Sequence, residues 1–83
     1  MKNLSVLILD QTKVTDAGLV NLKGLKNLGI LNLDQTKVGD AGLAHLKELK
    51  KLFEVYLRKT QVTKKGVDEL KKALPELEIV TGE

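Results

Sequence analysis

The sequence contains the same five residues twice, because DQTKV occupies positions 10–14 and again positions 34–38. When the chain is aligned with itself at an offset of 24, residues 4–27 and 28–51 are identical at 16 of 24 positions. Residues 52–76 form a more divergent third unit with one additional residue, and residues 77–83 begin a partial fourth. Self-similarity at this period is typical of solenoids, whose units pack on their neighbours. The period predicts one domain over residues 1–83, and this length allows no more than one.

The hydrophobic period changes within each unit. In the first unit, Leu7 and Leu9 alternate with outward positions, as in a short strand that turns two residues inward. Further along, Leu19, Leu22 and Leu25 are spaced by three, which is typical of the buried stripe of a short helix. Positions 31, 33, 43, 46 and 49 repeat this pattern, and positions 55, 57, 67, 70 and 74 nearly do. Each unit is therefore predicted to contain a strand, a turn, a helix and a return.

Polar and small residues recur where the chain passes from strand to helix. The threonines at positions 12, 36 and 60 are expected to bond backbone groups that the strand ladder leaves unpaired. Helix N-caps are expected at Thr15, Gly39 and Thr63. Asp16 and Asp40 follow in the first helical turn, where a carboxylate suits the positive end of the helix dipole. Glycine at positions 18, 42 and 66 costs about 1 kcal/mol relative to alanine, so we expect a close approach to the sheet or the next unit there.

The pattern LxxLxLxxTxVxDAGLxxLxxL, which the first two units carry, resembles a leucine-rich repeat. With Thr in place of the usual Asn or Cys, it is similar to repeats of bacterial leucine-rich proteins and to those attached to F-box-type ubiquitin-ligase adaptors. The third unit departs from the pattern at Lys64 and Lys65, which predicts a weaker helix start. The resemblance implies an α/β solenoid of about three and a half units, with a parallel sheet on the concave face and short helices on the convex face. It also implies binding rather than catalysis.

The outward strand positions are expected to form the concave face. If the strands stack in register, they form three columns: Val6, Ile30 and Glu54, with Ile79 beyond them; Ile8, Asn32 and Tyr56; and Asp10, Asp34 and Arg58. Apolar side chains on an exposed strand face are unusual, and tyrosine is a favoured contact residue. These nine residues at positions 6 to 58 are therefore the candidate protein-binding surface. The alternative is that β-branched residues occur there only because they suit a strand.

The third column, Asp10, Asp34 and Arg58, contains the charged residues of this surface. Asp10 and Asp34 are expected to lie one strand apart, at about 4.8 Å. Paired carboxylates can support acid–base chemistry or bind a cation, but no histidine, third carboxylate or glycine loop accompanies them. Arg58 is expected to pair with Asp34 as an exposed ion pair. The sequence therefore predicts that the chain is not an enzyme and has no catalytic residue, metal site or cofactor.

The composition excludes further classes of function. The chain has no cysteine and one histidine, so a disulfide framework and most transition-metal sites are not expected. Fourteen basic residues are interleaved with eleven acidic ones, for a net charge of +3. Because no aromatic or arginine residues lie among the helical lysines, nucleic-acid binding is not expected. The apolar run at residues 4–9 is too short for a signal peptide or a membrane span, which predicts a cytoplasmic chain without membrane contact.

These features predict a module that binds a protein or peptide on the concave face as part of a longer repeat protein. Two alternatives stay open. One is a recognition segment of a ubiquitin-ligase adaptor or effector whose chemistry lies elsewhere, and the other is a structural or designed repeat unit that associates with itself. Residues 1–4 supply no cap for the strand of Leu7 and Leu9, so self-association through an uncovered N-terminal edge, or a marginally stable monomer, is expected. In the fourth strand, Gly82 stands where an inward leucine is expected.

Overall fold

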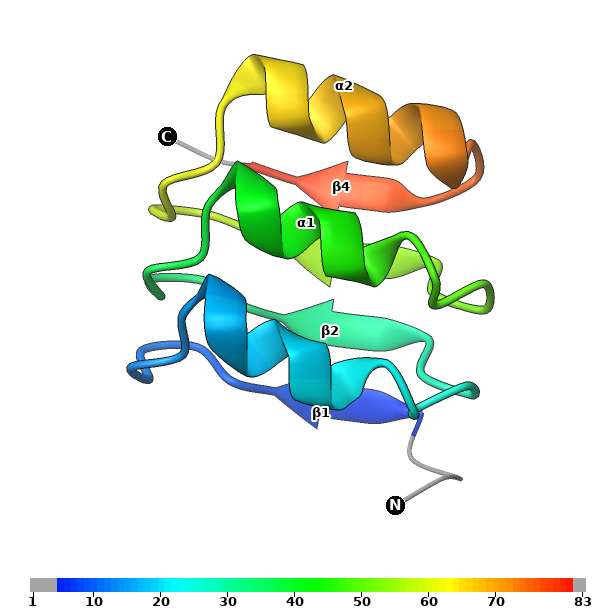
Figure 1. Ribbon diagram of the computed structural model, residues 1–83, viewed down its shortest axis with the longest axis horizontal. Coiled ribbons are helices and arrows are strands. Elements are labelled where there is room, and N and C mark those ends of the chain that lie inside the picture. The colour runs from blue at the N-terminus through cyan, green and yellow to red at the C-terminus, as the bar shows by residue number, and fades with distance from the viewer. Residues whose placement is uncertain (1–4, 82–83) are drawn as a thin grey trace.

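The chain forms one parallel sheet covered on one side by helices. The computed structural model describes residues 5–81, and it alternates strands with helices: β1 (Val6–Ile8), the 3-10 helix η1 (Asp16–Leu22), β2 (Ile30–Asn32), α1 (Asp40–Leu46), β3 (Glu54–Tyr56), α2 (Lys64–Ala73) and β4 (Glu78–Val80). In Figure 1 the strands form one layer and the three helices form a second layer beside it. The predicted α/β class with a parallel sheet is confirmed. We call β1 with η1 the first segment, β2 with α1 the middle segment, and β3 with α2 the third segment.

The strands are paired in sequence order, β1-β2-β3-β4, and every pair is parallel. Partners across each pair are 24 residues apart, so Val6 pairs with Ile30, Ile30 with Glu54, and Glu54 with Glu78. Between these outward positions lie Leu7, Leu31, Val55 and Ile79, which pair in one inward column. Positions separated by the sequence period therefore lie side by side across the sheet.

The expected outward position of Ile79 is wrong, because Ile79 pairs with Val55 and packs against the core. The additional residue of the third unit falls before Leu77, which is as buried as its counterpart Leu52. Val55 lies three positions after Leu52, but Ile79 lies only two positions after Leu77. The segment from the buried leucine to the inward strand residue is thus one residue shorter at β4 than at β3. As a result, Glu78 takes the place expected for Ile79 in the outward column. A one-residue slip of this kind moves every side chain of a strand to the opposite face.

The core lies between the sheet and the helix layer and is built from leucine and valine. Leu31 and Leu33 of the middle segment and Leu28 before it are fully buried, as are Leu43 and Leu46 of α1. Leu7 and Leu9 of the first segment also point inward, but they are only half-buried. Full burial of one such side chain stabilises the fold by roughly 1.5–3 kcal/mol, so the inward strand residues of the middle and third segments, which are fully buried, contribute more than those of the first.

Each strand ends in the same turn. The residue two positions beyond the last inward leucine has a positive φ, at 61° in Gln11, 59° in Gln35 and 59° in Lys59. This left-handed conformation costs about 1–2 kcal/mol for a residue with a side chain. The expected threonine bond accompanies it, because the hydroxyls of residues 12, 36 and 60 donate to the carbonyls of residues 9, 33 and 57 at 2.6, 2.7 and 2.8 Å. The turn thus satisfies carbonyl groups at the point where the ladder stops.

The helices begin at the predicted N-caps, Thr15, Gly39 and Thr63. Of these, the Thr63 side chain accepts a hydrogen bond from the Gly66 N–H. Despite the expected weaker start, α2 is the longest of the described helices, with 10 residues. The carboxylate that its first turn lacks is supplied by Asp40 of the middle segment, which accepts bonds from the Thr63 N–H and hydroxyl at 2.8 and 2.5 Å.

The junctions between segments explain two of the three helical glycines. Asp16 accepts a hydrogen bond from the Gly39 N–H at 2.6 Å, as Asp40 does from Thr63. A Cβ atom on Gly42 would lie 2.5 Å from the Asp16 Oδ1 atom, and one on Gly66 would collide with the Asp40 carboxylate. The expected close approach is therefore confirmed at positions 42 and 66, where the neighbour is the preceding segment's aspartate. Among the described residues, a Cβ at position 18 would meet only Val14, at 3.7 Å.

Some expectations concern residues outside the described range. The uncovered N-terminal edge depends on residues 1–4, and the interrupted fourth strand depends on Gly82. Within residues 5–81, none of the helices has the length and apolar character needed to cross a bilayer.

Candidate functional site

The face of the sheet that is turned away from the helices carries the predicted surface. We call this the open face; it comprises Val6, Ile8, Ile30, Asn32, Glu54 and Tyr56 on the strands, followed by Asp10, Asp34 and Arg58 just beyond them. The strand register brings the first six into two columns, as predicted from the sequence. Glu78 and Val80 of β4 extend these columns in place of Ile79. The open face therefore runs across all four strands.

The open face is apolar on its β1 side. Val6 is 45% exposed and Ile8 is 56% exposed, while Ile30 on the neighbouring strand is half-buried. The core does not bury Val6 and Ile8, because the outward positions of the strands point away from the helices. The two most exposed of the apolar candidates thus lie together on one edge strand.

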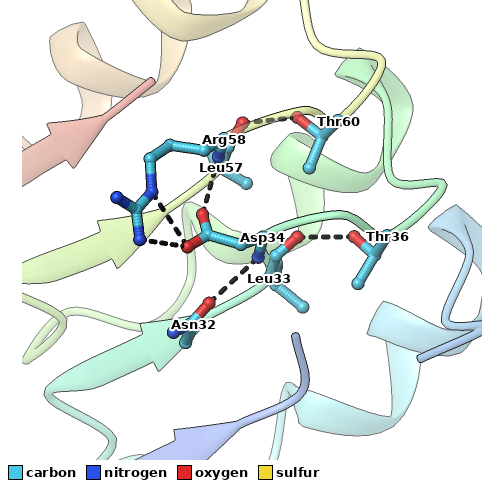
Figure 2. Close-up of polar contacts among 7 residues, drawn as sticks. All are labelled: Asn32, Leu33, Asp34, Thr36, Leu57, Arg58 and Thr60. Atoms are coloured by element: carbon cyan, nitrogen blue, oxygen red, sulfur yellow. Dashed lines mark hydrogen bonds and ion pairs between the residues drawn. The ribbon is translucent and has the colours of Figure 1, made fainter. Parts of the chain in front are cut away.

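The open face is polar where β2 and β3 end, and one ion pair dominates there (Figure 2). The Arg58 guanidinium donates from Nε and Nη2 to the Asp34 Oδ2 atom at 3.0 and 2.7 Å, and the Arg58 backbone N–H donates to Oδ1 at 2.7 Å. The predicted pairing is confirmed, but the pair is not fully exposed. The Asp34 side chain is only 9% exposed, whereas that of Arg58 is 50% exposed.

Asp34 is also held from its own strand. Its backbone N–H donates to the Asn32 Oδ1 atom at 3.0 Å, so Asn32 fixes the turn that places the carboxylate. With three donors from Arg58, this carboxylate is a structural acceptor. Asp10 is half-buried, and no hydrogen bond within residues 5–81 joins it to Asp34. The two aspartates therefore lie in one column without a hydrogen bond between their carboxylates.

Tyr56 lies between Glu54 and Arg58 in the sequence and interacts with both. A hydrogen bond with the Glu54 carboxylate raises the pKa of the Tyr56 phenol above its ordinary value. The Arg58 guanidinium carbon is 5.6 Å from the centroid of the tyrosine ring, within the range of a cation–π contact. Asp34 in turn raises the pKa of Arg58 above its ordinary value through its hydrogen bonds and its charge. Tyr56 thus interacts with Glu54 through its hydroxyl and with Arg58 through its ring.

Sequence reasoning missed Phe53, which is 57% exposed immediately before β3. A Cβ atom on Gly29 would lie 2.9 Å from the Phe53 ring, so the ring lies over the backbone of the preceding return. The signal was present, because this is the single phenylalanine of a chain with only 2% aromatic residues and the equivalent position 24 residues earlier is a glycine. Phe53 adds an exposed aromatic side chain near the start of the strands.

The other charged groups of residues 5–81 were compared with the requirements of a metal site and with the contacts of the lysines. Within the described range, no group of three histidine, aspartate or glutamate side chains is placed to hold a metal ion. On the helix side, Lys23 lies 3.9 Å from Glu48, and Lys51 donates to the Asn27 side chain at 3.1 Å. These contacts are exposed, and exposed ion pairs contribute at most about 1 kcal/mol.

No protein-family model matches the chain, and no curated protein is significantly similar to it in sequence.

Proposed function

We propose that the chain is a leucine-rich-repeat solenoid that binds a protein or peptide on its open, concave face. Val6, Ile8 and Ile30 form the apolar part of the contact, and Tyr56 with Arg58 forms the polar part. The partner is expected to carry an extended or loop segment with apolar side chains next to a hydrogen-bond acceptor. Catalysis is not part of this proposal.

The single observation that carries the proposal is the exposure of Val6 and Ile8 on a face that no described element covers. Exposed apolar residues next to an ordered aromatic and an arginine are typical of protein contacts, in which tyrosine and arginine are enriched. The regular 24-residue register supports the solenoid, because each strand pairs with the equivalent residues of the next. The interior aspartate keeps Arg58 in place with half of its side chain exposed to a partner.

The test is a selection of peptides from a displayed random library against the whole chain, followed by binding measurements on variants. Ile8→Thr combined with Tyr56→Ser should weaken the selected peptide at least about tenfold, because truncating a central contact residue costs about 1–2 kcal/mol or more. The matched control is Val20→Thr, since Val20 is 47% exposed on η1 and equally apolar. Selected peptides that lose affinity with the control but keep it with the open-face variant would contradict the proposal.

Folding must be separated from binding in this test. Thermal unfolding of each variant shows whether the open-face residues also hold the sheet together. If the melting temperature falls and affinity falls only in proportion to the unfolded fraction, the residues are structural, and the alternative based on strand propensity is correct.

A further inference from the structure

The first outward column of the open face changes from apolar to acidic across the sheet. Val6 of β1 and Ile30 of β2 are followed in register by Glu54 of β3 and Glu78 of β4. The two glutamates are thus directly opposite one another on neighbouring parallel strands, about 4.8 Å apart. Like charges in such positions are unfavourable in a sheet. The column therefore has an apolar half and an acidic half.

The acidic half of this column has no countercharge within residues 5–81. Glu54 lies on an interior strand, and the residues opposite it are Ile30 on one side and Glu78 on the other. Neither neighbouring strand therefore brings a basic side chain against it. The Tyr56 hydroxyl makes a hydrogen bond with the Glu54 carboxylate but carries no charge. The ion pairs found in the described residues include neither glutamate.

The basic residue of the open face does not supply this charge. The Arg58 guanidinium donates from two nitrogens to Asp34, so these two charges offset one another. The other charged residues on this face are Asp10, Glu54 and Glu78, all acidic, whereas the whole chain has a net charge of +3. The open face is thus locally acidic on a basic chain, and such a surface attracts cations and repels anions.

The spacing of the two halves suits an extended segment that crosses the strands. Successive positions in the column are about 4.8 Å apart, so Glu54 and Glu78 lie about 4.8 and about 9.6 Å from Ile30. Alternate side chains of an extended chain point to the same side and are about 6.6–7 Å apart. A residue two positions from the one that lies over Ile30 is therefore placed between the two glutamates.

We propose that the open face binds an extended peptide segment with a lysine or arginine two positions from an apolar residue. The apolar side chain lies over Val6 and Ile30, and the basic side chain lies between Glu54 and Glu78, where it offsets their repulsion. This inference rests on the proposed function and adds the charge and the spacing of the partner. Arg58 then takes an uncharged carbonyl as its acceptor, because the acidic half of the column repels a carboxylate.

The test extends the peptide selection on the whole chain by reading the sequences of the selected peptides. Lysine or arginine two positions from an apolar residue should be enriched, and aspartate and glutamate should be depleted. For one selected peptide, Glu54→Gln combined with Glu78→Gln should lower the affinity about fivefold, which corresponds to an exposed ion pair, and should weaken its dependence on salt. The matched control is Glu48→Gln combined with Glu69→Gln, which changes the net charge equally on the helix side and should leave the affinity unchanged.

A charge reversal tests whether the basic residue contacts the two glutamates. In a chain with Glu54→Lys and Glu78→Lys the preference should reverse. The copy of the peptide with glutamate in place of its basic residue should then bind more tightly than the selected peptide. Thermal unfolding confirms that each variant is folded at the temperature of the binding measurement.

Two results would overturn this inference and leave the proposed function standing or replace its partner. If Ile8→Thr with Tyr56→Ser weakens the selected peptides but the glutamine substitutions at positions 54 and 78 do not, the open face binds its partner without a basic residue. If the chain alone forms a dimer in sedimentation, and the same glutamine substitutions abolish it, the cations come from the lysines of a second copy. Peptides that lose affinity only with the helix-side variant, or a selection that yields no binding peptide, would contradict the proposed function as well.

Discussion

The first and middle segments have nearly the same sequence but different environments. Leu9 is half-buried and Thr12 is exposed, whereas their counterparts Leu33 and Thr36 are 0% and 4% exposed. The middle segment has a neighbour on each side, since α1 packs against both η1 and α2. Among the described residues, the first segment packs against the middle one alone. The same residues therefore contribute different amounts of stability, because burial depends on the neighbours and not on the pattern itself.

Helix geometry follows the same difference. DAGLVNL forms a 3-10 helix at Asp16–Leu22, while DAGLAHL forms an α-helix at Asp40–Leu46. Short helices gain most of their stability from packing, so of these two seven-residue helices the one with two helix neighbours adopts the regular form, whereas α2, with one described helix neighbour, is three residues longer. Val20 also replaces Ala44, and a β-branched residue favours the helix less than alanine does. Both causes act in the same direction.

The largest difference is expected for alanine at the inward leucines. Leu33→Ala should lower the free energy of unfolding by about 3–4 kcal/mol, since it leaves a cavity in the packed core. Leu9→Ala should cost less than half as much, because that side chain is already partly hydrated. Urea unfolding followed by circular dichroism measures both. Equal losses at the two positions would show that the first segment is covered as completely as the middle one.

The Leu33→Ala variant can unfold altogether, because a domain of this size has a small stability margin. Leu33→Val and Leu9→Val then provide the comparison with smaller cavities, and the same order of losses is expected.

The helical glycines should respond to alanine with opposite signs. Gly42→Ala places a Cβ atom 2.5 Å from the Asp16 carboxylate and 2.8 Å from a Leu19 methyl, so a loss of about 2 kcal/mol is expected. At the equivalent position, Gly18→Ala meets only Val14 at an ordinary contact distance. Alanine's higher helix propensity should then raise stability by roughly 0.5–1 kcal/mol. Thermal unfolding of the two single variants checks the signs, and destabilisation by both would mean that a neighbour also crowds Gly18.

Much of this architecture was predictable because the period and the alternation are local. The 24-residue offset predicted which residues pair across the first three strands, and the spacing of leucines predicted which sides of the helices are buried. The threonine turn was predictable for the same reason, since it joins residues three positions apart. Features confined to one unit or to two adjacent units in exact register were accessible from the sequence.

The predictions from sequence failed where the 24-residue period is broken or where two segments meet. The register of β4 depends on where the chain absorbs one additional residue, and the sequence around Leu74 and Leu77 fits both placements. The aspartate bonds across the junctions join residues 23 positions apart, which no single-unit pattern reveals. A signal did exist, because Asp16 precedes Gly42 by the same 26 positions as Asp40 precedes Gly66. On the open face, the sequence predicted the pairing of Asp34 with Arg58 but not the burial of Asp34, whose side chain is only 9% exposed.

Alanine substitution of the aspartates should also cost more stability in the middle segment than in the first, as is expected for the leucines. Asp34→Ala removes the acceptor for the backbone and guanidinium groups of Arg58, so a loss of about 1.5 kcal/mol is expected. Asp10→Ala should change stability by less than about 0.5 kcal/mol, because surface substitutions without such bonds usually do. Urea unfolding at low and high salt measures both. A loss at Asp10 equal to that at Asp34 would indicate that the first strand end has partners of its own.

A smaller effect is expected at the junction of the middle and third segments, where it depends on pH. The Thr63 hydroxyl and backbone N–H hold the pKa of Asp40 below its ordinary value of 3.8, and Lys65 acts in the same direction. Because the folded pKa is the lower one, the stabilisation is complete well above pH 3.8 and is lost as the pH falls through the folded pKa. Thr63→Val should raise the pKa of Asp40, which carboxyl-carbon NMR measures. An unchanged pKa would show that the hydroxyl bond is not formed in solution.

The smallest effect is expected for a substitution that makes the first junction resemble the second. Gly39 occupies the N-cap of α1 without a side chain, whereas Thr63 both caps α2 and donates to Asp40. The Gly39 backbone is extended, with φ −125°, and an added Cβ would lie no closer than 3.5 Å to the Asp16 carboxylate, so the backbone and the Cβ position accept a side chain. Gly39→Thr should raise the free energy of unfolding by about 0.5 kcal/mol, because threonine exceeds glycine as an N-cap by only a few tenths and the bond to Asp16 adds a little more. The matched control is the same substitution in an Asp16→Asn background, where the part of the gain that depends on the carboxylate should disappear. A full gain in that background would assign the effect to the loss of glycine's flexibility in the unfolded chain, and the two junctions would then differ in capping alone.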